Sequence, residues 1–181
     1  MNRDALLDSS YLVALLDGTD VWHKRARAIA EALDTWSIAS VVSDCVINEV
    51  ASVLARRCRD KGRNAAAVLR ELLDRFPPHE LTYLYPEIRR MMEPAFSLMA
   101  ATDGRLSFHD ALLGLSAREM GTGLIVTFDL DFTALEWLRV VSKPEDLHPP
   151  QGVREGPAPR EFPAPAAARW KRKTPEKRSR T

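Results

Sequence analysis

Short apolar runs alternate with longer amphipathic segments through most of this sequence, and the alternation restricts the chain to few architectures. The apolar runs are too short for helices, whereas the segments between them have helical periodicity and helix-capping residues. This order is typical of an α/β fold with a mostly parallel central sheet flanked by helices. We expect four to five strands, at 5–7, 37–42, 81–84, 124–127 and 139–141, of which 81–84 is the weakest. Helices are expected at about 11–16, 21–33, 44–60, 65–76, 87–101 and 108–120, with a kink or a division into two shorter helices at Pro94.

Composition divides the chain into a core-forming part and a tail. With 181 residues and 45% hydrophobic content, the sequence suits one domain, which we place at 1–148. Residues 149–181 are rich in Pro, Ala, Arg and Lys and are expected to be disordered. The net charge of +1 therefore hides a mildly acidic domain and a basic tail. That tail either binds phosphates nonspecifically or serves as a solubilising extension.

Several classes of protein do not fit the sequence. No apolar stretch approaches the roughly 18 residues that a membrane span needs, and the N-terminal apolar run is too short for a signal peptide. The two cysteines have no metal-type spacing and form no disulfide framework. We therefore expect a cytoplasmic protein without a membrane association.

Four acidic residues occupy the positions where an α/β sheet binds ligands. Asp8 and Asp129 follow predicted strands, Asp110 lies in the first turn of a predicted helix, and Glu49 lies in the second turn of another. Strand ends and the starts of the following helices share one edge of a parallel sheet, so these carboxylates should converge. Each acid taken alone is more often a helix cap or a solvated side chain. The set is more specific, because apolar residues flank its members.

Converging carboxylates repel one another unless a cation lies between them. Oxygen ligands of this kind suit Mg²⁺, with Mn²⁺ as an alternative. Such an ion can activate water and stabilise charge on a phosphodiester. Ser9 and Thr127 adjoin the two acids at strand ends and are expected to support them.

Four motifs together resemble the PIN-domain family, and most closely its VapC-like toxins: LLDSS at 6–10, VINEV at 46–50, LSFHDALL at 106–113 and VTFDLDF at 126–132. The resemblance implies a Mg²⁺- or Mn²⁺-dependent endoribonuclease, the toxin of a toxin–antitoxin pair. It assigns catalysis and metal binding to the four acids, with Asp131 as an assisting acid and Thr127 as an active-site hydroxyl. It also implies an RNA substrate, an antitoxin protein as partner and a homodimer.

Two other functions fit parts of the sequence. The segment at 124–133 matches the motif of haloacid-dehalogenase phosphatases, in which Asp129 would be the nucleophile and Asp131 the acid/base. That motif opens the fold of its own family, whereas here it lies near the end of the predicted domain. A catalytically silent PIN-like binding module is the second alternative, and the presence of all four acids argues against it.

Other polar and aromatic residues receive secondary interpretations. His109 is expected to point away from its neighbour Asp110, because adjacent residues on a helix diverge. Basic residues near the cleft would compensate the negative charge of the acids and so favour binding of RNA, a polyanion. The tryptophans are interpreted as core or interface residues rather than base-stacking surfaces. The basic candidates are Arg56, Arg57 and Arg118, and the tryptophans are Trp22, Trp36 and Trp137.

Overall fold

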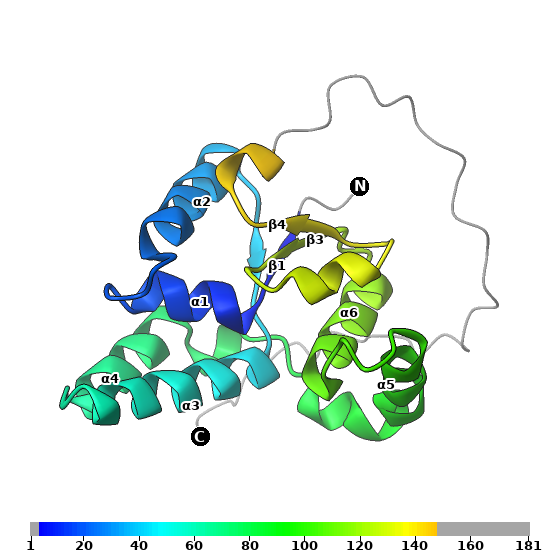
Figure 1. Ribbon diagram of the computed structural model, residues 1–181, viewed down its shortest axis with the longest axis horizontal. Helices are drawn as coiled ribbons and strands as arrows, with labels where there is room; N and C mark the ends of the chain where they lie inside the picture. Colours follow the sequence, from blue (N-terminus) through cyan, green and yellow to red (C-terminus); the bar gives the residue numbers. More distant parts are fainter. Residues whose placement is uncertain (1–3, 148–181) are drawn as a thin grey trace, which may run out of the picture. The chain divides into compact units, whose positions relative to one another are not determined.

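The computed structural model describes residues 4–147, which form a sheet surrounded by helices (Figure 1). The strands are β1 (Ala5–Leu7), β2 (Ser40–Val41), β3 (Leu124–Val126) and β4 (Arg139–Val141). The helices are α1 (Ser9–Leu16), α2 (His23–Thr35), α3 (Asp44–Asp60), α4 (Ala65–Arg75), α5 (Ile88–Ala101) and α6 (Phe108–Met120). Four short 3₁₀ turns lie at Pro78–Glu80, Tyr85–Glu87, Leu130–Ala134 and Pro144–Leu147. The predicted α/β class is confirmed, and the predicted tail at 149–181 lies outside the described residues.

All strand pairs of the sheet are parallel, in the order β2-β1-β3-β4. In this order the first strand of the chain lies in the middle of the sheet and pairs directly with β3, where Leu7 is opposite Val126. The carboxyl ends of β1 and β3 therefore lie side by side, although the sequence places them far apart. This pairing brings the residues after Leu7 and after Val126 to one edge.

Burial of apolar side chains explains why a sheet of such short strands is stable. Leu6 and Ile125 are fully buried in the sheet, as are Leu12 and Leu112 in the helices beside it. Helix α1 packs against both α2 and α3, while α3 packs on α4 and α5 packs on α6 (Figure 1). Gly121 ends α6 with a φ of 68°, a left-handed conformation that favours glycine.

The predicted strand at 81–84 is wrong apart from a single bridge between Ser43 and Thr82. The Asp44 carboxylate explains the difference, because it accepts hydrogen bonds from the backbone N–H groups of Leu84 at 2.8 Å and Tyr85 at 3.2 Å. Those donors are no longer available to a strand partner, and the chain turns into the 3₁₀ segment that contains Pro86. Pro94 also lies within one continuous α5 rather than between two shorter helices.

None of the helices in the part of the chain that the structure describes is long and apolar enough to span a membrane.

Candidate active site

Asp8 lies at the centre of the carboxyl edge of the sheet. It directly follows β1, caps the N-terminus of α1 and is 5% exposed. Its backbone N–H donates to the carbonyl oxygen of Val126 at 3.0 Å, which continues the β1–β3 pairing by one residue. Thr127, the residue after β3, consequently lies beside Asp8.

Three donors converge on a single oxygen of the Asp8 carboxylate. The Oγ1 of Thr127 donates to Oδ2 at 2.7 Å, and Ser10 donates to it through Oγ at 2.6 Å and through its backbone N–H at 3.1 Å. An N-capping side chain accepts such bonds from the second or third helical residue, which explains the role of Ser10. The Oδ1 oxygen is not engaged by these three bonds, so the network fixes the carboxylate without using both of its oxygens.

The same two hydroxyls also hold the segment after β3. The Oγ1 of Thr127 accepts from the backbone N–H of Asp129 at 2.9 Å, and the Oγ of Ser10 accepts from that of Phe128 at 2.9 Å. Thr127 is fully buried, so its hydroxyl bonds are shielded from water. Asp8 and the backbone of Asp129 are thus connected through one side chain.

Glu49 lies within electrostatic reach of Asp8 and Asp110. Burial raises the pKa of Glu49, a hydrogen bond from Ser9 lowers it, and the charges of Asp8 and Asp110 raise it again, with His109 opposing them. Burial likewise raises the pKa of Asp8, against the hydrogen bonds from Ser10 and Thr127. Both shifts show that the charged forms of these carboxylates lack sufficient compensation.

Asp110 and Asp129 each use one oxygen for local capping. Ser107 and Asp110 form a reciprocal capping box at the start of α6, in which the backbone N–H of Ser107 donates to Oδ2 of Asp110 at 2.8 Å. The backbone N–H of Asp131 donates to Oδ1 of Asp129 at 2.8 Å. The carboxylate of Asp131 pairs with exposed Arg105 at 3.3 Å. Capping thus positions the two acids, which fits both a structural and a catalytic role.

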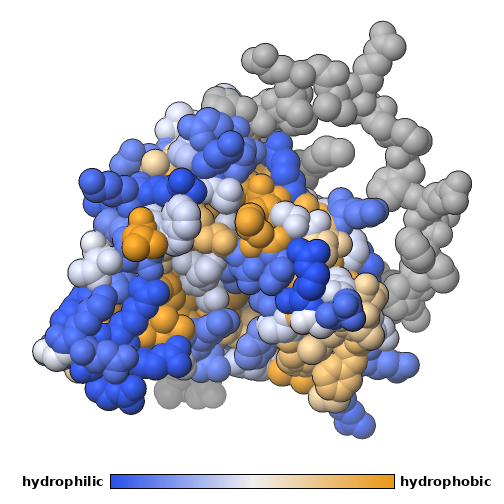
Figure 2. Space-filling view, viewed as in Figure 1, coloured by the Kyte–Doolittle hydropathy of each residue, from blue (hydrophilic) through white to orange (hydrophobic). Residues whose placement is uncertain are grey.

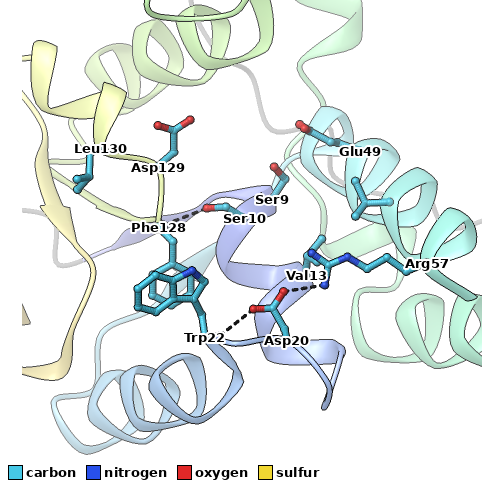
Figure 3. A pocket seen from close by; sticks show the side chains of 11 residues that line it. Ser9, Ser10, Val13, Asp20, Trp22, Glu49, Arg57, Phe128, Asp129 and Leu130 are labelled. Atoms are coloured by element: carbon cyan, nitrogen blue, oxygen red, sulfur yellow. Dashed lines mark hydrogen bonds and ion pairs between the residues drawn. The ribbon is translucent and has the colours of Figure 1, made fainter. Parts of the chain in front are cut away.

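A cleft of about 460 Å³ opens beside these groups (Figure 3). Figure 3 shows Asp129 and Glu49 on facing sides, with Ser9 and Ser10 between them. The lining residues are Ser9, Ser10, Val13, Asp20, Trp22, Glu49, Val53, Arg57, Phe128, Asp129 and Leu130. The cleft therefore joins predicted site residues from α1, α3 and the segment after β3.

The donor set suits a hard cation, since it consists of carboxylate and hydroxyl oxygens. A cation would also relieve the electrostatic penalty that raises the pKa values of Asp8 and Glu49. Within residues 4–147, no group of three or more His, Cys, Asp or Glu side chains is arranged to hold a metal ion. Mg²⁺ commonly binds through one or two carboxylates and keeps several waters, so the residues fit that type of site.

The sequence comparison identifies the family of this chain. A family model described as the PIN domain matches residues 5–138. The chain belongs to the PIN-domain family. This finding confirms the resemblance that the four motifs predicted. No curated protein matches the sequence significantly.

Among solved structures, this PIN-domain protein is similar to VapC20 of Mycobacterium tuberculosis, described as a sarcin–ricin loop cleaving toxin. The TM-score is 0.56 and the sequence identity is 25%. The match covers 74% of this chain and 95% of the other, so it extends over nearly the whole toxin.

Several features of this PIN-domain site were not predicted from the sequence. Ser10 was left out of the predicted set, although its position in the first turn after a capping Asp was a usable signal. Arg57 lines the cleft as predicted, but it is bound to Asp20 at 2.7 Å and to Asp17 at 3.1 Å. Trp22 and Phe128 line the cleft through contacts that no local pattern predicts.

One secondary interpretation, that of Arg118, also changes. Arg118 lies over the ring of Trp137 at 4.9 Å, where its guanidinium forms a cation–π contact, and it does not line the cleft. The charge of His109 lowers the pKa of the Glu49 carboxyl, and its ring lies 6.5 Å from that of Tyr85 between centroids.

Proposed function

We propose that this protein is a divalent-metal-dependent endoribonuclease and the toxin of a toxin–antitoxin pair. The observation that carries the proposal is the buried carboxylate of Asp8, fixed by Ser10 and Thr127 at the sheet edge and coupled electrostatically to Glu49. Membership of the PIN-domain family and the similarity to a VapC toxin support the same reaction.

Mg²⁺ is the proposed cofactor, and Mn²⁺ can replace it. The residues that would hold the ion are Asp8, Glu49, Asp110 and Asp129. When bound, the ion supplies an activated water and neutralises charge on the phosphate. An ion held by one or two of these carboxylates and by waters would satisfy the arrangement without all four acids binding directly.

The residues of the chain orient the reacting groups. Thr127 and Ser10 fix the rotamer of Asp8, and Ser9 is hydrogen-bonded to Glu49. Asp131 is proposed as an assisting acid, and its backbone N–H also donates to Asp129. Preorganisation of this kind accelerates hydrolysis because the acids need not rearrange as charge develops on the phosphodiester.

The proposed partners follow from the toxin assignment. RNA would lie across the cleft, and an antitoxin protein would block it in the cytoplasm, where RNA substrates are available. A homodimer is also proposed, and exposed apolar side chains on α5 support it: Met92 is 44% and Phe96 is 56% exposed. Figure 2 shows a hydrophobic patch over this helix. Patches of this kind commonly mark protein–protein contacts.

Inducible expression in a bacterial host tests the toxin assignment. Wild type should arrest growth and degrade RNA, whereas Asp110→Asn should do neither at the same protein level. Asp60→Asn is the control, because Asp60 is an exposed acid at the C-terminal end of α3 and should leave toxicity unchanged. Equal toxicity of wild type and Asp110→Asn would reject the assignment.

A further inference from the structure

An aromatic stack of exposed Trp22 and half-buried Phe128 forms one wall of the cleft. Trp22 lies over Phe128 with ring centroids 5.4 Å apart and an interplanar angle of 20°. Both residues line the cleft together with Glu49 and Asp129 (Figure 3). Trp22 is 42% exposed, so its indole remains accessible to a ligand rather than belonging to the core.

The position of this stack is fixed relative to the acids. The backbone N–H of Phe128 donates to the Oγ of Ser10, the hydroxyl that also binds Asp8. The backbone N–H of Trp22 donates to Oδ1 of Asp20 at 2.8 Å. Phe128 also lies between Thr127 and Asp129 in the sequence. A ligand on the stack is therefore held at a defined place next to the carboxylates.

Cationic side chains accompany the aromatic rings. The Cζ of Arg25 lies 4.5 Å from the centroid of the Trp22 ring, and Arg25 is exposed. Arg57 lines the same cleft from α3, where its guanidinium is already paired with Asp17 and Asp20. A flat aromatic face beside the guanidinium of Arg25 matches a base attached to a phosphate backbone.

We propose that Trp22 and Phe128 form a stacking platform for an unpaired nucleobase beside the scissile phosphate. This inference rests on the proposed nuclease function and assigns the two rings to one unpaired base of the RNA substrate. A base within a duplex is already stacked and paired, so it is not free to enter the platform. The base displaces the guanidinium of Arg25 from the indole face, and that guanidinium then pairs with an adjacent phosphate.

The test compares RNA binding by Trp22→Ala and Trp36→Ala, both in an Asp8→Asn background that does not consume the substrate. Trp36 is a matched control, because it is also 42% exposed and lies at the opposite end of α2. The probes are a fluorescently labelled, mixed-sequence single-stranded RNA and the same strands annealed to their complements. Fluorescence anisotropy in Mg²⁺ gives both affinities.

Trp22→Ala should weaken single-stranded binding roughly 5- to 150-fold, the range for loss of one base–aromatic stack. Duplex affinity should not change, Trp36→Ala should bind like its parent, and Trp22→Phe should retain most of the affinity. Single-stranded RNA should also quench tryptophan emission in the parent protein more than in Trp22→Phe. This second readout tests the platform even if Trp22→Ala folds poorly.

Equal affinities of Trp22→Ala and Trp36→Ala for single-stranded RNA would overturn the proposal. The two rings would then be interpreted as a contact surface for a protein partner. An equal loss on single-stranded and duplex RNA would also overturn it. The proposed function fails separately: if the protein with an intact Asp8 cleaves no RNA but Trp22 still governs single-stranded binding, the platform stands without the nuclease. If cleavage occurs with the same KM in Trp22→Ala, only the platform is rejected.

Discussion

Replacing Thr127 by Val removes one hydroxyl while keeping nearly the same side-chain shape. In the folded protein that hydroxyl donates to Asp8 at 2.7 Å and accepts from the backbone N–H of Asp129 at 2.9 Å, and the residue is fully buried. The variant therefore leaves a buried carboxylate with one donor fewer and a backbone N–H without this acceptor. Each loss costs about 1–3 kcal/mol, so the free energy of unfolding should fall by about 2–6 kcal/mol.

The cleavage rate should fall as well, because Thr127 holds Asp8 and the backbone of Asp129 in place. Thr127 itself is not expected to contact the substrate. Removal of such a supporting group lowers metal affinity or activity roughly 10- to 100-fold. Denaturant unfolding in EDTA gives the stability, and RNA cleavage at saturating Mg²⁺ gives the activity.

Thr127→Ser is the control, since it keeps the hydroxyl and removes only one methyl group. It should lose about 1 kcal/mol of stability and retain most of the activity. If Thr127→Val and Thr127→Ser behave alike in both assays, the hydroxyl does not hold the site and the reasoning is refuted.

Three further predictions concern stability. Burial alone would raise the pKa of Asp17, but hydrogen bonds from Thr19 and from basic partners outweigh it and hold the pKa well below its ordinary value of 3.8. Asp17→Asn should therefore lose about 2–4 kcal/mol of unfolding free energy at neutral pH. The difference from wild type, measured by denaturant unfolding, should narrow as the pH falls below about 4. Protonation of Asp17 in the wild type then removes the stabilisation that its carboxylate provides at higher pH. A deficit that stays constant with pH would contradict this. Gly114→Ala should lose about 1–3 kcal/mol in unfolding free energy, because the added methyl group meets the side chain of Leu135; an unchanged melt would show that Leu135 rearranges freely. Asp8→Asn keeps a good helix cap and should melt at or above the wild-type temperature in EDTA; a large loss of stability there would make Asp8 a structural residue.

Local sequence signals predict the elements of this fold well. The apolar runs and capping residues indicate six helices and the four paired strands, because burial and capping act within a few neighbouring residues. The parallel arrangement then places Asp8 and Thr127 together, since both directly follow strands that prove to be partners. The strand expected at 81–84 fails because Asp44, distant in sequence, binds its backbone donors.

The parts of the site that the sequence did not predict depend on contacts between distant segments. The stacking of Trp22 on Phe128 is a contact between the residue before α2 and the segment after β3. The periodicity of the sequence does not predict such a tertiary contact. Likewise, the sequence around Arg57 does not reveal its partners, whereas in the folded protein Arg57 forms ion pairs with Asp17 and Asp20. Tertiary pairing therefore decides which charges remain available to a ligand.

The central claim is that Asp8 is the core of a metal-dependent ribonuclease site, and cleavage of a mixed RNA pool tests it most directly. Purified wild type and Asp8→Asn are compared in Mg²⁺, in Mn²⁺ and in EDTA. We expect wild type to cleave in either metal and not in EDTA, and Asp8→Asn to lose more than about 100-fold of the activity, since even supporting residues of such sites contribute 10- to 100-fold. Equal cleavage by the two proteins, or cleavage that persists in EDTA, would contradict the account.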